Sequence, residues 1–265
     1  MGDLLLVAAL AIGLLMLATW IVSVIVNDAS IVDIVWGLGF VVATVVAYLS
    51  SPIDTTTDRS LLMLFMVGLW GLRLSIYLAW RNIGSGEDRR YRAMRKKSPD
   101  SFWMVSLYKV FGLQAVLMWV VAVPAIVVHA IDRSLYWLDF VGLGIWAVGL
   151  FFETVGDVQL ARFKARPDSK GKLMDRGLWR YTRHPNYFGD FCVWWGIYIV
   201  AAAGGAWWTI FSPLVMSVLL MKYSGVGPLE KTITKRRPGY EEYAERTNAF
   251  FPGPPKDAPR RASGL

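Results

Sequence analysis

The chain has 265 residues, of which 55% are hydrophobic, and it carries a formal net charge of +8. A soluble domain of this size cannot bury so much apolar surface, so the composition indicates a membrane protein with several spans. A single cysteine, Cys192, excludes an internal disulfide framework, and two distant histidines, His129 and His184, predict no metal site. The cations lie between apolar segments, which is typical of the cytoplasmic side of a membrane protein, and we expect no nucleic-acid partner.

Apolar segments long enough to cross a bilayer recur along the chain. A spanning helix needs about 20 mostly apolar residues. The sequence predicts an all-α polytopic membrane protein with about seven transmembrane helices, at 4–26, 31–50, 60–80, 104–129, 135–161, 189–203 and 206–223. We expect no cleaved signal peptide, because the opening MGDLLLV lacks a basic region and belongs to the first span.

The basic residues are distributed unevenly among the connecting segments. Segments 81–103 and 162–187 and the C-terminal region are rich in Lys and Arg, whereas 51–59 and 130–134 hold one Arg each. Basic segments favour the cytoplasmic side, so seven spans place the N-terminus outside and the C-terminus in the cytoplasm. We interpret the chain as one membrane domain that ends in a Pro-rich, mobile tail at 253–265.

Ionisable residues inside the spans form one candidate site. Asp33 lies in the second span, one turn before Gly37, and Arg73 lies in the third span, one turn before Tyr77. Asp33 either caps its helix near the membrane surface or pairs with Arg73, whose side chain could also reach the surface by itself. The two helices run antiparallel, so we expect Asp33, Arg73 and Tyr77 to share one cavity.

Charged residues also follow one face at the end of the fifth span. At 100° per residue, Glu153, Asp157 and Lys164 fall within a sector of about 40°. Two acids one turn apart repel each other in an apolar environment, so we expect donors from a ligand to offset this repulsion. The alternative is that both acids are solvated at the end of the span.

The stretch RYTRHPNYFGDF precedes the sixth span. Pro185 favours the first position of a helix, whose free N–H groups and dipole attract an anion, and Arg180 and Arg183 add positive charge. Asn186 and Asp190 lie one turn apart and offer hydrogen-bonding groups for a ribose or a carboxamide. The stretch therefore predicts a site for a phosphate-bearing cofactor, although the two arginines alone could simply anchor the chain at the interface.

GLWRYTRHPNYFGDF, together with the acidic face before it, resembles the C-terminal cofactor region of the steroid 5α-reductase family, especially its bacterial DUF1295 branch. The sterol C14/Δ7 reductases share a similar turn. The resemblance is strongest over 145–252 and weaker over 28–110. It implies an NADPH-dependent reductase of a carbon–carbon double bond in a steroid, sterol, isoprenoid or fatty acyl substrate.

The resemblance also implies where the parts of such an enzyme lie. Residues 135–252 correspond to the NADPH-binding half, and residues 1–130 correspond to the half that holds the lipophilic substrate. The expected location is the bacterial inner membrane, in contact with membrane lipid and with the active site open to the cytoplasm. Nothing in the sequence specifies an oligomeric state.

Residue by residue, the resemblance carries over to the cofactor half. Asp157 matches an Asp of the family, Asn186 matches the Asn that contacts the cofactor, and Lys164 stands in place of an Arg. The implied cofactor-binding residues are Glu153, Asp157, Lys164, Lys172, Tyr181, Arg183, His184, Asn186, Tyr187, Asp190, Lys222 and Glu230.

The catalytic residues do not carry over in the same way. The catalytic Tyr of the family aligns with Trp70, and its paired Gln-Glu aligns only loosely with Asp33. The catalytic candidates in this chain are therefore Tyr77, Asp33 and Arg73, with Tyr77 or Asp33 as the proton donor.

Two other functions remain open on the sequence. Isoprenylcysteine and phospholipid methyltransferases also carry an RHP-x-Y turn, with a Glu near the C-terminus that meets S-adenosylmethionine, and Glu230 could take that place. A non-catalytic sterol-binding scaffold is the third interpretation, because a fold does not determine a function.

Overall fold

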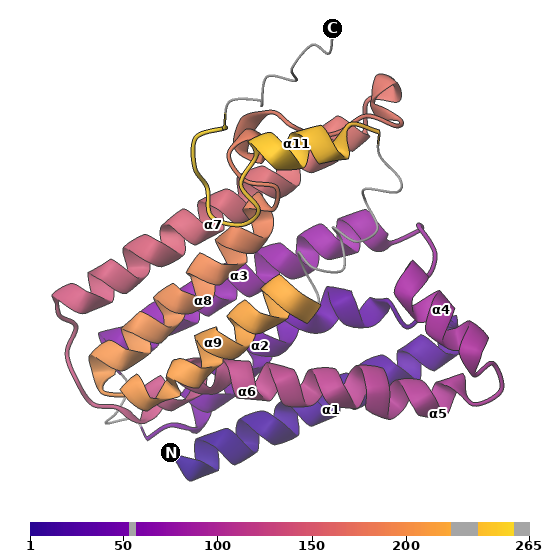
Figure 1. Ribbon diagram of the computed structural model, residues 1–265. Coiled ribbons are helices and arrows are strands. Elements are labelled where there is room, and N and C mark those ends of the chain that lie inside the picture. The colour runs from indigo at the N-terminus through magenta and orange to yellow at the C-terminus, as the bar shows by residue number, and fades with distance from the viewer. Residues whose placement is uncertain (53–56, 224–237, 257–265) are drawn as a thin grey trace, which may run out of the picture. The chain divides into compact units, whose positions relative to one another are not determined.

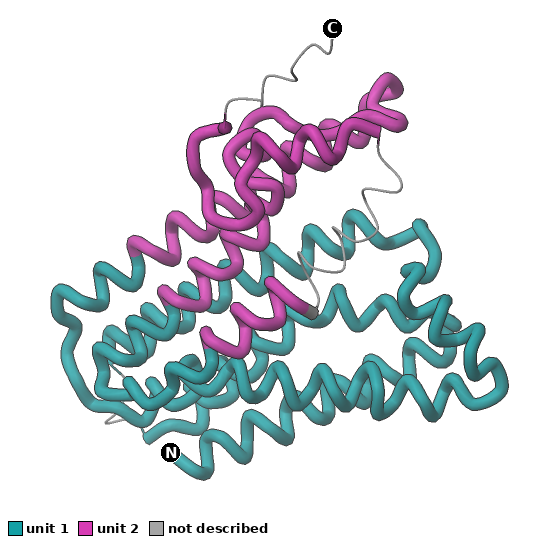
Figure 2. Tube along the Cα trace, in the orientation of Figure 1, with its two compact units in different colours: residues 1–143, 197–212 teal, residues 144–196, 213–265 magenta. Residues whose placement is uncertain are grey.

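The chain forms helices that gather into two compact units. The structure is a computed structural model that describes residues 1–52, 57–223 and 238–256, and no strand occurs in these ranges. The first unit comprises residues 1–143 and 197–212, and the second comprises 144–196 and 213–265 (Figure 2).

Six helices are long and apolar enough to cross a membrane (Figure 1). They are α1 (Gly2–Val26), α2 (Ile31–Ser50), α3 (Asp58–Asn82), the stretch Phe102–Ala130, α7 (Trp137–Lys164) and α8 (Pro185–Gly204). The fourth of these consists of α5 (Phe102–Ser106), the π-helical turn Leu107–Gly112, α6 (Leu113–Val127) and the 3-10 turn Val128–Ala130. Each coincides with a predicted span, so the all-helical, membrane-integral fold is confirmed.

The seventh predicted span forms a shorter apolar helix, Trp207–Lys222. It contains the 3-10 turn Trp207–Ile210 and α9 (Phe211–Val218), and it ends in the π-helical turn Leu219–Tyr223. Gly205, at φ 111°, terminates α8 in a backbone conformation that favours glycine. The count of seven spans is not confirmed, and the sides on which the termini lie stay predictions.

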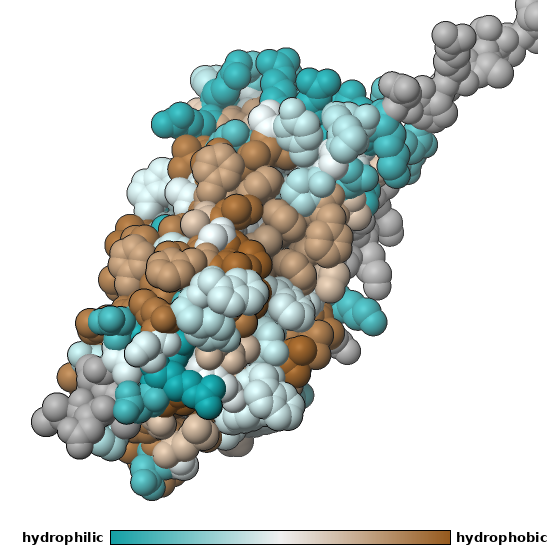
Figure 3. Space-filling view, turned by 90° about the vertical axis from the view of Figure 1, so that its left-hand side faces the viewer, coloured by the Kyte–Doolittle hydropathy of each residue, from teal (hydrophilic) through white to brown (hydrophobic). Residues whose placement is uncertain are grey.

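Hydrophobic side chains cover much of the face seen in Figure 3. On α1, Leu6, Leu10 and Leu14 are 60%, 59% and 67% exposed and follow one another at one-turn spacing. Exposing such side chains to water costs free energy, whereas exposing them to lipid tails does not, because the tails are equally apolar. The exposed apolar surface is that of a protein in contact with membrane lipid.

Helix α2 contacts α1, α3 and α6 in the first unit. It lies close to α3 where Gly37 meets Gly71: a Cβ on Gly71 would lie 2.6 Å from the carbonyl oxygen of Gly37. The absence of side chains at Gly37 and Gly71 allows this close approach of the two helices. Phe40 packs edge-on against Trp70 at 5.5 Å between ring centres, and Trp70 is fully buried. Trp70, which the sequence comparison aligned with the catalytic Tyr of the steroid 5α-reductases, is therefore a core residue.

A buried ion pair joins the start of α3 to the start of α7. Arg59 Nε donates to Asp139 Oδ1 and Arg59 Nη2 to Asp139 Oδ2, both at 2.8 Å. The same guanidinium donates to the carbonyl oxygens of Arg133 and Ser134 at 2.8 and 2.9 Å, and both side chains of the pair are 0% exposed. Both charges are therefore removed from water, and both are held by hydrogen bonds. The bonds to Arg133 and Ser134 attach the segment before α7 to the start of α3.

We expect Asp139→Ala to lower the free energy of unfolding by about 3–5 kcal/mol, because Arg59 would stay buried without its carboxylate. Unfolding of the purified protein in detergent micelles measures this loss. Replacing both residues, as Arg59→Met with Asp139→Leu, should recover most of it.

Asp168→Ala is the matched control. It removes a pair with Arg166 whose side chains are 61% and 57% exposed, and we expect a change below about 1 kcal/mol. A loss at Asp139 no larger than the loss at Asp168 would contradict the stabilising role of the buried pair.

Candidate functional site

Two glycines bring α7 and α8 into close contact in the second unit. A Cβ on Gly149 would lie 2.5 Å from the carbonyl oxygen of Gly189, and a Cβ on Gly189 would lie 2.5 Å from the backbone nitrogen of Glu153. About two turns further along α7, a Cβ on Gly156 would lie 3.2 Å from the ring of Pro185. The absence of side chains at these positions lets the middle of α7 lie directly against the first two turns of α8.

This contact places two buried acids of α7 beside polar groups of α8. Glu153 and Asp157 are 3% and 4% exposed, so the interpretation in which both are solvated is wrong. Asn186 Nδ2 donates a hydrogen bond to Asp157 Oδ1 at 3.2 Å. The amide of the chain thus offsets part of the repulsion between the acids that sequence reasoning assigned to a ligand.

The segment before α8 is fixed to α7. The helix begins at Pro185, as predicted from the preference of proline for the first helical position. Before it, in the 3-10 turn Gly177–Arg180, Trp179 Nε1 donates to the carbonyl oxygen of Gly156 at 3.1 Å, and the backbone N–H of Leu178 donates to Gln159 Oε1 at 3.0 Å. These bonds determine where the helix N-terminus lies relative to the acids.

The end of the described chain pairs with the segment that leads into α8. Residues 248–253 follow α11 (Tyr240–Arg246). The N–H of Arg183 donates to the carbonyl oxygen of Asn248 at 2.9 Å, and the N–H of Gly253 donates to that of Tyr181 at 3.1 Å. Between them, Thr182 Oγ1 donates to the carbonyl oxygen of Phe250 at 2.8 Å. Residues 248–253 therefore run alongside residues 181–183, which lead into α8.

The remaining predicted cofactor residues differ in exposure. Lys164, Lys172, Tyr181 and Lys222 are exposed, and Arg183, Tyr187 and Asp190 are half-buried. His184 is buried and stacks on Tyr187 with 5.6 Å between ring centres. Glu230 lies outside the described residues, as does the part of the predicted tail after residue 256.

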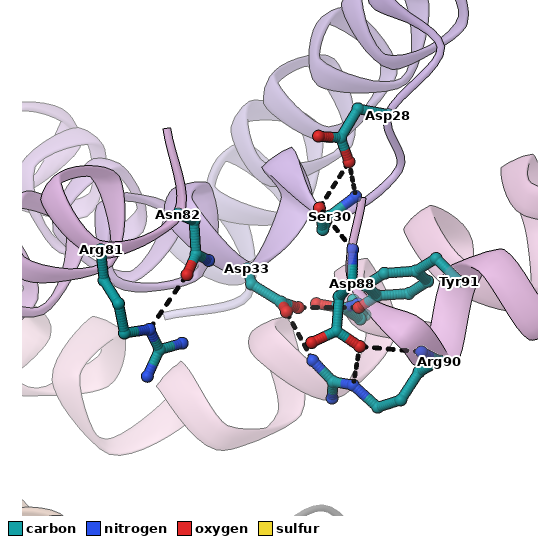
Figure 4. Close-up of polar contacts among 9 residues, drawn as sticks. Asp28, Ser30, Asp33, Arg81, Asn82, Asp88, Arg90 and Tyr91 are labelled. Atoms are coloured by element: carbon teal, nitrogen blue, oxygen red, sulfur yellow. Dashed lines mark hydrogen bonds and ion pairs between the residues drawn. The ribbon is translucent and has the colours of Figure 1, made fainter. Parts of the chain in front are cut away.

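In the first unit, Asp33 binds a cation and a hydroxyl donor that sequence reasoning missed (Figure 4). Arg90 Nη2 lies 2.6 Å from Asp33 Oδ2, and the hydroxyl of Tyr91 donates to Asp33 Oδ1 at 2.7 Å. Gln114 Nε2 donates in turn to the Tyr91 hydroxyl at 3.3 Å. Burial and the adjacent carboxylate raise the pKa of Tyr91, so its hydroxyl stays protonated as a donor.

The predicted partner of Asp33 is therefore corrected from Arg73 to Arg90, and Asp33 does not act as a helix cap. Arg90 and Tyr91 belong to α4 (Arg89–Lys97), which follows a segment with positive φ at Gly84 and Gly86. These glycines favour a turn of the chain after α3. No periodic pattern in the sequence, however, indicates that α4 would lie against Asp33.

Arg73 and Tyr77 do lie together, as predicted. The guanidinium carbon of Arg73 is 5.7 Å from the centre of the Tyr77 ring, and that of Arg81 is 5.6 Å from the same ring. A phenol between two cations is suited to proton donation, because positive charge stabilises the negative charge that develops on its oxygen. Whether Asp33 opens into the same cavity stays a prediction.

Over the described ranges, no group of three or more His, Cys, Asp and Glu side chains could hold a metal ion.

Comparison with known proteins places the chain in a family. Residues 19–247 match the family described as "Protein of unknown function (DUF1295)". An uncharacterized protein of Schizosaccharomyces pombe is 25% identical over 264 residues, which cover 88% of this chain and 75% of that relative. No solved structure matches the chain. Because this match covers most of the chain, the chain belongs to the DUF1295 family.

Proposed function

We propose that the protein is an NADPH-dependent reductase of a carbon–carbon double bond in a steroid, sterol, isoprenoid or fatty acyl substrate. The observation that carries this proposal is the pair of buried acids, Glu153 and Asp157, held against Asn186 in the first turn of α8. These residues belong to the motif that resembles the cofactor region of the steroid 5α-reductase family. The cytoplasm is the proposed side for cofactor entry.

The residues present suit the groups that NADPH offers. Carboxylates accept hydrogen bonds from ribose hydroxyls and from a carboxamide, and the Asn186 amide can donate or accept. The start of α8 suits a phosphate, because helix N-termini attract anions. When bound, NADPH supplies the hydride, and the protein supplies binding, orientation and a site without water.

The cations beyond α7 suit the phosphate that distinguishes NADPH from NADH. Lys164, Arg166, Lys170 and Lys172 are all exposed and lie within nine residues of one another. Asp168 pairs with Arg166 and Lys172 at 3.2 and 3.5 Å, which leaves a surplus of positive charge over the segment. Such a segment favours a ligand with the extra anionic group.

Tyr77 is the proposed proton donor. Both carboxylate oxygens of Asp33 are already engaged, one by Arg90 and the other by the Tyr91 hydroxyl. Tyr77 lies between the guanidiniums of Arg73 and Arg81. Proton donation from a positioned phenol to one carbon, with hydride delivered to the other, completes the reduction.

First, we expect NADPH to raise the melting temperature of the purified protein more than NADH does, and S-adenosylmethionine to leave it unchanged. A ligand at about 100 times its dissociation constant stabilises the folded state by about 2.7 kcal/mol. Equal shifts in melting temperature with NADPH and NADH would contradict the proposal that the exposed cations bind the 2′-phosphate, which only NADPH carries. A shift with S-adenosylmethionine alone would favour a methyltransferase.

Second, we expect Asn186→Ala to weaken NADPH binding by about tenfold to a hundredfold, since a hydrogen bond to a charged group contributes about 1.5–3 kcal/mol. Calorimetry on the folded variant measures this change. Asn82→Ala, which removes an amide that accepts from Arg81 on α3, is the control and should bind NADPH normally. Normal binding by both variants would mean that the turn only anchors the chain.

Third, we expect Tyr77→Phe to lower the rate of NADPH oxidation with α,β-unsaturated carbonyl lipids by about 10²–10⁴-fold while NADPH affinity stays unchanged. Tyr108→Phe, on a side chain that is 54% exposed, is the control. If Tyr77→Phe retained its rate and Tyr91→Phe lost it, the proton donor would be the phenol bound to Asp33 instead.

A further inference from the structure

Helix α4 is the most basic element of the described chain. Its nine residues read RRYRAMRKK and include six cations. Asp88 caps the helix: its Oδ1 accepts from the backbone N–H of Arg90 at 2.8 Å. The helix follows α3 and precedes α5, so it lies between two membrane-spanning stretches of the first unit.

One face of α4 is attached to the rest of the first unit. Tyr91 is its buried residue and binds Asp33 of α2. Arg95 donates to Glu87 Oε1, just before α4, at 2.8 Å. It also donates at 2.6 Å to Oδ1 of Asn27, which lies in the turn between α1 and α2. These contacts use two cations of the helix, Arg90 and Arg95, and they determine which face of α4 points outward.

The opposite face carries cations that these contacts do not use. Arg89, Arg92 and Lys96 are exposed, and they fall within a sector of about 60° at 100° per residue. Among the described residues, the structure gives none of the three an acidic partner. Three guanidinium and ammonium groups therefore project from one side of a helix whose orientation in its unit is fixed, along about 10 Å of its axis.

Aromatic residues on the flanking spans indicate where the membrane surface lies. Trp80, in the last turn of α3, is 69% exposed, and Trp103 and Tyr108, just after α4, are 50% and 54% exposed. Trp20 Nε1 of α1 donates to the carbonyl oxygen of Trp103 at 2.9 Å. Exposed Trp and Tyr concentrate at the level of the lipid headgroups, so α4 lies between residues that mark this level.

We propose that the outer face of α4, formed by Arg89, Arg92 and Lys96, binds the phosphate headgroups of anionic phospholipids in the surrounding bilayer. Guanidinium groups bind phosphate with two parallel hydrogen bonds, and an ammonium binds it as a point charge. Basic clusters next to spans attract anionic lipids in this way. The membrane is favoured over a nucleic acid because the flanking aromatic residues place the cations at headgroup level.

The test compares lipid binding by the purified full-length protein in detergent, with phosphatidylglycerol and phosphatidylcholine as probes in native mass spectrometry. We expect tighter binding of phosphatidylglycerol. R89Q/R92Q/K96Q should lose about a hundredfold of that affinity, at about fivefold per cation, and R89K/R92K/K96R should retain it. Added salt should weaken the binding by wild type.

The control is R162Q/R176Q/K256Q, which changes the net charge equally at exposed positions outside α4. Full phosphatidylglycerol binding by R89Q/R92Q/K96Q, or an equal loss in the control, would overturn the proposal. Equal affinity of wild type for the two lipids would also overturn it. A labelled oligonucleotide provides the last comparison: if R89Q/R92Q/K96Q lost only oligonucleotide binding, the surface would be one for nucleic acid.

Discussion

The contact between Gly149 of α7 and Gly189 of α8 is the constraint on which the candidate cofactor site depends. A Cβ on either residue would lie 2.5 Å from the backbone of the other helix, so only glycine allows this approach. From that contact, the i, i+4 geometry of α7 turns Glu153 and Asp157 toward the first turn of α8, where the Asn186 amide reaches Asp157. The backbone bonds from Arg183 and Gly253 then hold the C-terminal segment along the same turn. A site built from main-chain contacts in this way is positioned before any ligand arrives, which lowers the cost of ordering it.

Much of the fold could be predicted because span length is a property of the local sequence. The second span was predicted at 31–50, and α2 runs over the same residues. Hydropathy alone placed the start of the sixth span at 189, since the residues before it are polar, whereas the preference of proline placed the helix start correctly at Pro185. The pair Arg59–Asp139 could not be predicted, because its members are 80 residues apart and no pattern of either helix specifies the other.

The candidate site, like the fold, could be predicted from the sequence only in part. Glu153, Asp157 and Asn186 each lie in a regular helix, so periodicity was enough to place them on the correct faces. Asp33 also lies in a helix, but its partner Arg90 comes from α4 beyond two glycines with positive φ, whereas the sequence offered only a helix cap or a pair with Arg73. Pairing of the C-terminal segment with residues 181–183 uses mostly main-chain groups, which leave no signature in side-chain composition. Helix periodicity orients a side chain within its own element, whereas contacts made through turns need the three-dimensional fold.

The central claim is that the first turn of α8 and the acidic face of α7 bind NADPH. Hydrogen–deuterium exchange of the full-length protein in detergent, with and without a saturating concentration of the cofactor, tests it most directly. The N–H groups at a helix start lack partners within the helix, so a bound phosphate should slow their exchange. The account predicts NADPH-dependent protection in peptides covering residues 177–190 and no such protection with S-adenosylmethionine. Unchanged exchange in these peptides at saturating NADPH, or protection by S-adenosylmethionine alone, would contradict it.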